Sequence, residues 1–103
     1  MSADEASVTH IVMARVVGGA TEAQIDEVVA ALAALPPQIP EIRSYSVGRD
    51  LGLLDGNWDI AVTGVFASAE DFHAYVAHPA HQKVVRELLD PISVERIRVQ
   101  FAS

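Results

Sequence analysis

Cysteine is absent from the 103-residue sequence. Its absence excludes a disulfide framework, a thiolate metal site and a cysteine nucleophile, and it is typical of a protein in the reducing cytoplasm, which is the location we predict. No apolar run approaches the roughly 20 residues that cross a bilayer, and the first residues lack the basic and apolar regions of a secretory signal. We therefore expect no membrane partner.

Basic residues are also scarce. The sequence has seven Lys and Arg against fourteen Asp and Glu, which gives a formal net charge of −7. Binding to a nucleic-acid backbone needs a basic surface, so we predict no nucleic-acid partner. The simplest interpretation of the excess negative charge is that it keeps the protein soluble.

Hydrophobic residues, in contrast, make up 50% of the chain, which is enough for a real core. We predict a disordered tail over residues 1–6 and a single domain over residues 7–103. A domain of this size is marginally stable alone, so surplus apolar surface is expected to be buried in a homodimer.

Local patterns divide the domain into strands and helices. Alternating and β-branched residues predict strands over 8–17, 42–50, 58–66 and 94–101. Between them, Thr21 and Gln24 fit a capping box at the start of one helix, Ser68 fits the N-cap of a second, and Pro79 suits the first position of a third. The order β-α-β-β-α-α-β is a split βαβ pattern. The predicted fold class is α+β, ferredoxin-like, with a four-stranded antiparallel sheet and helices on one face.

The sheet face without helices is expected to be apolar. It would carry Ile11, Met13, Ala61 and Val65, which should not stay in contact with water. A second copy of the sheet packing on this face would bury them. We therefore predict a sheet-to-sheet homodimer that forms an α/β barrel.

The chemical groups gather in the segment 75–81, Tyr-Val-Ala-His-Pro-Ala-His. If His81 lies in the first turn of a helix, the helix N-terminus disfavours the imidazolium, and a neutral imidazole is a competent general base at pH 7. A nearby phenol can donate a hydrogen bond to an enolate. The hypothesis is that His81 acts as base and Tyr75 as hydrogen-bond donor, provided that the chain bends at Pro79.

A purely structural interpretation of the same segment stays open. In it, His78 caps free backbone N–H groups, His81 bonds a backbone carbonyl, and Tyr75 is a core aromatic with its hydroxyl at the rim. His10, alone on an apolar strand face, is then a core histidine with a satisfied hydrogen bond.

Three segments together resemble a known family. They are Val8-Thr-His-Ile-Val12, Ile42-Arg-Ser-Tyr-Ser-Val-Gly-Arg49 and Tyr75-Val-Ala-His-Pro-Ala-His81. Over about residues 8–101 the chain resembles the stress-responsive A/B barrel (Dabb, dimeric α/β barrel) domains. The resemblance implies a ferredoxin-like subunit whose sheet packs on that of its mate, with a pocket between sheet and helices.

Within that family the chain is similar to polyketide cyclases of the olivetolic acid cyclase type, which need no cofactor. The similarity implies that the acid/base pair of those enzymes falls on Tyr75 and His81, with His10 positioning a substrate carbonyl. It also implies a pocket for a small hydrophobic molecule, with His78 beside it and a wall made of Val12, Ala14, Val29, Val62, Ile97 and Val99. Val28 and Val29 stand where the cyclase has larger side chains, so the substrate shape is expected to differ.

A metal site is not expected. His78 and His81 are three residues apart, but no carboxylate has a suitable spacing for a third ligand and His73 should lie near the opposite side of its helix. A weak magnesium at a rim carboxylate stays open. The predicted function is a dimeric small-molecule-binding protein, acting as a cofactor-free aldol-type polyketide cyclase. The alternatives are a non-enzymatic stress-response or ligand-binding protein and a cofactor-free monooxygenase.

Overall fold

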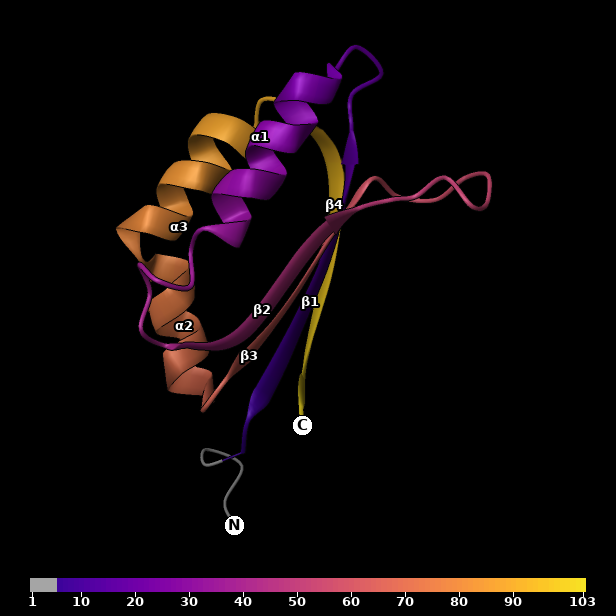
Figure 1. Cartoon of the computed structure of the whole chain (residues 1–103). Helices are drawn as coiled ribbons and strands as arrows, with labels where there is room; N and C mark the ends of the chain where they lie inside the picture. The colour runs from indigo at the N-terminus through magenta and orange to yellow at the C-terminus, as the bar shows by residue number, and fades with distance from the viewer. Residues whose placement is uncertain (1–5) are drawn as a thin grey trace.

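The structure is a computed structural model that describes residues 6–103. It confirms the predicted element order (Figure 1). The elements are β1 (Val8–Val16), α1 (Glu22–Ala33), β2 (Ile42–Arg49), β3 (Ile60–Phe66), α2 (Ala69–Ala77), α3 (Pro79–Val84), the π-helical turn η2 (Val85–Leu89) and β4 (Ser93–Ala102). Apart from Ala6, the predicted tail lies outside the described residues.

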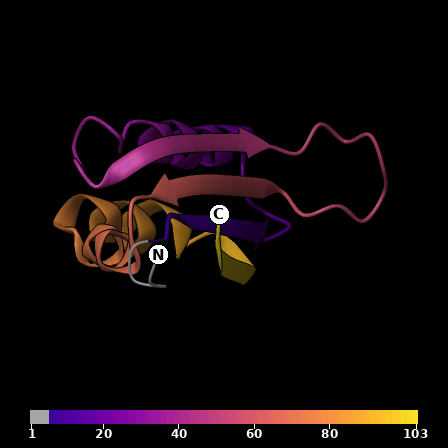
Figure 2. The same cartoon turned by 90° about the horizontal axis from the view of Figure 1, so that it is seen from below.

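The four strands form one antiparallel sheet in the order β2-β3-β1-β4, as the ferredoxin-like prediction required. All helices cover the same face, and the other face is bare (Figures 1 and 2). No helix in the described part of the chain is long and apolar enough to cross a membrane. The cytoplasmic location stays a prediction.

The core lies between α1 and the covered face of the sheet. The predicted capping box starts α1: the Gln24 backbone N–H donates to the Thr21 hydroxyl at 3.1 Å, and the Gln24 side chain accepts from the Thr21 backbone at 2.8 Å. One buried stripe of α1 faces the sheet, and it consists of Ile25, Val28 and Leu32. Burial of such a stripe, more than helix propensity, holds a helix of this length in place.

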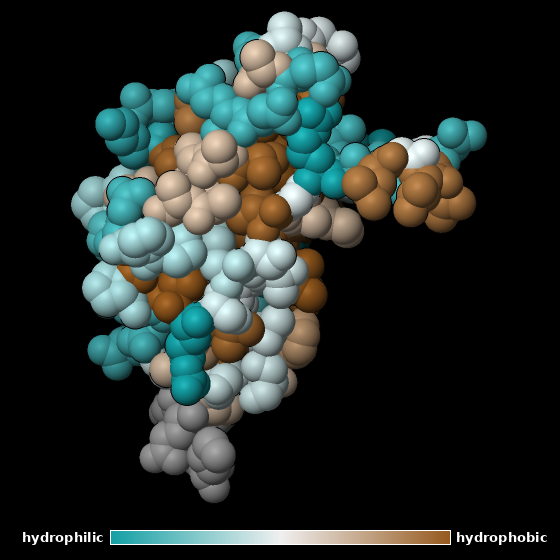
Figure 3. All heavy atoms as spheres, in the orientation of Figure 1, coloured by the Kyte–Doolittle hydropathy of each residue, from teal (hydrophilic) through white to brown (hydrophobic). Residues whose placement is uncertain are grey.

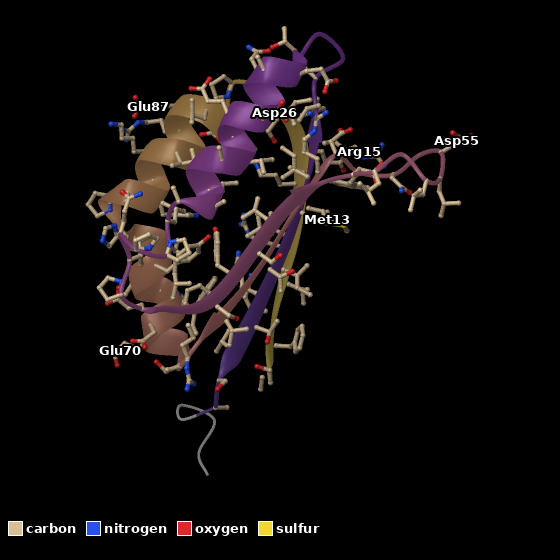
Figure 4. All side chains as sticks on the ribbon, viewed as in Figure 1. Met13, Arg15, Asp26, Asp55, Glu70 and Glu87 are labelled. Carbon is tan, nitrogen blue, oxygen red and sulfur yellow. The ribbon has the colours of Figure 1, made fainter. Side chains whose placement is uncertain are left out.

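The bare face of the sheet is apolar. Directly opposed residues of antiparallel strands share a face, and Ile11 lies opposite Val99 while Met13 lies opposite both Ile97 and Ala61. Figure 4 shows Met13 projecting away from the helices. Ile97, Val99 and Phe101 are 44%, 52% and 47% exposed. This confirms that the chain exposes an apolar sheet face.

A long arm, residues 50–59, joins β2 to β3 and projects beyond the sheet (Figures 1 and 2). Hydrophobic atoms gather on it (Figure 3), and its three leucines, Leu51, Leu53 and Leu54, are exposed. Asp55 stands at its tip (Figure 4). The arm shortens the strand that follows: β3 begins at Ile60 instead of Trp58, because the Asp59 carboxylate turns back to accept from the Val16 N–H at 2.9 Å.

Gly64 in β3 provides the space for an aromatic ring from the neighbouring strand. A Cβ at this position would lie 3.2 Å from the Tyr45 ring and 3.2 Å from the Phe66 ring, whereas a Cβ at Gly48 would meet nothing within 4 Å. Phe66 is fully buried and the Tyr45 hydroxyl is hydrogen-bonded, so neither ring has room to move freely.

We therefore expect Gly64→Ala to lower the free energy of unfolding by about 1–3 kcal/mol through overpacking. Gly48→Ala, the matched control in the same sheet, should be neutral or stabilising by up to about 1 kcal/mol. Urea denaturation of both variants checks this. Equal unfolding midpoints for the two variants would show that the Tyr45 ring is not confined by Gly64.

Candidate active site

A cavity of about 350 Å³ lies between the helix-covered face of the sheet and the helices. This volume is within the range of small-molecule sites. Its lining consists of His10, Val12, Leu32, Tyr45, Val62, Phe72, His73, Tyr75, Val76, His81, Val85, Leu89, Arg96, Arg98 and Gln100. It therefore brings together the three residues predicted to carry the chemistry, His10, Tyr75 and His81.

A bend between α2 and α3 places two of these residues in contact. His78 ends α2 with an extended backbone, and Pro79 starts α3. The His78 Nδ1 accepts from the Ala80 N–H at 3.1 Å and so caps α3, as the structural interpretation of this histidine predicted. Across the bend, the Tyr75 and His81 rings lie 4.3 Å apart between centroids. The condition that the chain must bend at Pro79 is met.

His81 is held in one tautomer by the backbone. Its Nδ1 lies 3.2 Å from the Val76 carbonyl oxygen, which can only accept, so Nδ1 carries the hydrogen. The Nε2 lone pair is then the basic site. Burial lowers the pKa of His81 below its usual value, although the bond to Val76 partly opposes this. The imidazole is therefore neutral at pH 7, as a general base requires, and burial is the largest cause of the lowered pKa.

Tyr75 forms a pair with Tyr45, for which the sequence alone predicts no role. The hydroxyl oxygens of Tyr75 and Tyr45 are 2.7 Å apart. Burial raises the pKa of both phenols, so both stay protonated at neutral pH. Two hydroxyls that share one hydrogen bond have one O–H left to donate. The pair can therefore offer one hydrogen-bond donor to a ligand.

His10 is held in the opposite tautomer. It is only 5% exposed, and its Nδ1 lies 2.9 Å from the Gln100 side-chain nitrogen, which donates. The remaining nitrogen, Nε2, then carries the hydrogen. Burial lowers the pKa of His10 to about 4, and the charges of His81 and Arg98 add to the effect. His10 is thus both a satisfied core histidine and a neutral N–H donor beside the cavity.

These groups make a complementary set. His81 offers a lone pair, while His10 and the tyrosine pair offer hydrogen-bond donors, all in one partly desolvated cavity. A neutral base beside donors that can stabilise a developing oxyanion is the combination that proton abstraction next to a carbonyl needs. The roles of the individual residues stay predictions.

The predicted pocket wall is partly wrong. Val12 and Val62 line the cavity, but Ala14 is buried in the core, and neither Val29 nor His78 is among the lining residues. Ile97 and Val99 lie on the bare face, opposite Met13 and Ile11.

The strand β4 turns its polar side to the cavity instead. Arg96, Arg98 and Gln100 line it. These three residues alternate along the strand with Ile97 and Val99, so the predicted wall had the opposite face of β4 turned to the cavity. The pairing of Gln100 with His10 shows which face of β4 is turned to the helices, and this pairing is known only from the strand register.

A larger hollow of about 620 Å³ lies elsewhere, between the sheet and the 50–59 arm. Its lining includes Met13, Thr63 and Trp58 but no histidine or tyrosine. Its ionisable lining residues, Arg49 and Asp50, already have hydrogen-bonding partners, so we place the candidate site in the smaller cavity. Among residues 6–103, no cluster of three or more His, Asp or Glu side chains is arranged to hold a metal ion.

Comparison with known proteins agrees with this architecture. The model of the stress responsive A/B barrel domain (Dabb) family matches residues 8–103. A dimeric ferredoxin-like protein of unknown function from Thermobifida fusca is 35% identical and superposes with a TM-score of 0.89, covering 100% of this chain and 96% of that one. A dimeric protein of ferredoxin-like fold from Bacteroides fragilis is 25% identical, with a TM-score of 0.85 and coverage of 94% and 96%.

An enzyme shares the fold. The hydroxynitrile lyase from Passiflora edulis is 23% identical, with a TM-score of 0.82 over 96% of this chain and 94% of that one. At this identity the likeness shows the fold alone. No curated protein sequence matches the chain significantly.

The cavity geometry predicts how the histidines titrate. Nuclear magnetic resonance of the imidazole protons should give a midpoint of about 4 for His10 and a midpoint below 6.5 for His81. In the unfolded chain His10 has a pKa near 6.5. The stability gained by burying His10 in its neutral form is therefore complete above that pH and is lost as the pH falls toward 4. The loss amounts to about 3 kcal/mol. A His10 midpoint near 6.5 would contradict its burial as a neutral donor.

Proposed function

The chain belongs to the stress-responsive A/B barrel (Dabb) family, and from this we propose that it is a homodimer whose cavity binds a small hydrophobic carbonyl compound and acts on it by cofactor-free acid/base chemistry. Aldol-type cyclisation of a polyketide-like substrate is the reaction that we favour. One observation carries the proposal: the neutral His81 imidazole lies against Tyr75 in a cavity large enough for a ligand.

The proposed reaction begins at Nε2 of His81, which takes a proton from the carbon next to a substrate carbonyl. The enolate oxygen accepts hydrogen bonds from the free O–H of the Tyr45–Tyr75 pair and from Nε2–H of His10. The enolate carbon then attacks a second carbonyl of the same molecule and forms a carbon–carbon bond. The His81 imidazolium returns its proton to the new alkoxide, so no cofactor or external acid is consumed.

A non-enzymatic ligand-binding role is the alternative that a specific observation favours. The bond from His81 to the Val76 carbonyl and the cap made by His78 are also what a purely structural helix junction needs. In that case the cavity would bind its ligand without turnover. A cofactor-free monooxygenase, the other alternative, would consume oxygen with a quinol-type substrate.

Substitution of the base tests the catalytic proposal. With a linear poly-β-keto thioester that also carries a free carboxylate as substrate, His81→Gln should lower kcat by a factor of about 100 or more, because a general base contributes roughly that much. The control is Gln82→Ala, an exposed neighbour on α3 that does not line the cavity, which should keep the wild-type rate. A wild-type rate for His81→Gln would rule out His81 as the base.

The homodimer is proposed from the bare sheet face. Its apolar side chains cover the sheet from β1 to β4, and apolar patches of this kind usually mark an interface. The 35% identical protein from Thermobifida fusca is described as dimeric. Sheet-to-sheet packing of two copies would bury this face in each of them.

We expect Val99→Glu to convert the dimer into a monomer at micromolar concentration, because the interface would bury an unpaired carboxylate. Gln82→Glu adds the same charge on the helical side and should leave the dimer intact. Light scattering after size-exclusion chromatography measures the mass of both variants. A wild-type protein that is already monomeric under these conditions would contradict the homodimer.

A further inference from the structure

The cavity lining has a charge that is opposite to that of the whole chain. Acidic residues outnumber basic ones by fourteen to seven in the sequence. Among residues 6–103, no Asp or Glu lines the cavity, whereas two arginines, Arg96 and Arg98, do. In an acidic protein, a cavity lined by arginines and not by carboxylates favours the binding of an anion.

The two arginines are not equivalent. Arg96 is bound by its own strand and the preceding turn, through Asp90 and the Ser93 hydroxyl. Arg98 has no carboxylate within ion-pair distance among residues 6–103. Its guanidinium group therefore keeps its hydrogen-bonding capacity for a ligand.

The position of Arg98 fits a ligand with two unlike ends. It lies opposite Val12 in the strand register, one alternate position from Gln100 and on the same side of β4. The lining also includes Val62, Val85 and Leu89, which are apolar. Arg98 itself is exposed, so it stands where the cavity opens to water. An apolar body would fill the cavity while a charged group stays at its mouth.

We propose that the cavity selects a carboxylate-bearing apolar ligand, with Arg98 as the residue that holds the carboxylate. A guanidinium group matches a carboxylate with two parallel hydrogen bonds, which a lysine cannot reproduce. The proposal rests on the proposed small-molecule-binding function and narrows its substrate to an acid. Arg98 would fix which end of the substrate faces the His81 base.

A pair of probes of nearly the same shape, one charged and one neutral, tests this. Binding of 4-butylbenzoate and of 4-butylbenzamide is measured by isothermal titration calorimetry on the wild-type protein, at pH 7.5 and low salt. We expect the carboxylate to bind about tenfold more tightly than the amide, as is typical of a hydrogen bond to a charged group.

Three variants assign the effect. Arg98→Gln should weaken binding of the carboxylate about tenfold and leave the amide unchanged. Arg98→Lys should restore part of the loss. Arg86→Gln removes an equal charge from an exposed position outside the cavity lining and should change neither affinity. Because Arg98 is exposed, its replacement is not expected to unfold the domain.

The possible results distinguish failure of the carboxylate site from failure of the small-molecule function. Equal affinity of the wild-type protein for acid and amide, or an equal loss for both probes in Arg98→Gln, would overturn the carboxylate site and leave the cavity as a binding site. Failure of both probes to bind at millimolar concentration would overturn the small-molecule function, and the carboxylate site with it.

Discussion

The candidate site depends on the bend between α2 and α3. His78 stops one helix and caps the next through its own imidazole, and Pro79 fixes the first backbone angle of the new helix. Without this bend, residues six apart on a continuous helix would point to different sides. With it, the Tyr75 and His81 rings lie 4.3 Å apart and close one side of the cavity.

The sheet supplies the other side of the cavity and separates two kinds of chemistry. Its covered face carries His10, Gln100 and Arg98, while its bare face carries Ile11, Val99 and other apolar residues. In a lone domain we would expect the opposite distribution on β4, with apolar residues inside and polar ones outside. The observed distribution is consistent with a chain whose outer face packs against a second copy and whose inner face binds a polar group of a ligand.

Much of the fold follows from local sequence signals. The capping box at Thr21, the Ser68 cap and the Pro79 start each fix an element locally, and the structure has all three. The lining of the cavity is a matter of register between distant strands, which local patterns do not determine. For this reason the predicted pocket wall contains Ile97 and Val99, which lie on the bare face, and local patterns predict no role for Tyr45, thirty residues before its partner Tyr75.

The central claim is that His81 and His10 are neutral at pH 7 in opposite tautomers, one as a base and one as a donor. A long-range proton–nitrogen correlation spectrum of the histidine side chains reports the tautomer of each ring directly. The account predicts a hydrogen on Nδ1 of His81 and on Nε2 of His10. A charged His81, or a His81 with its hydrogen on Nε2, would contradict it.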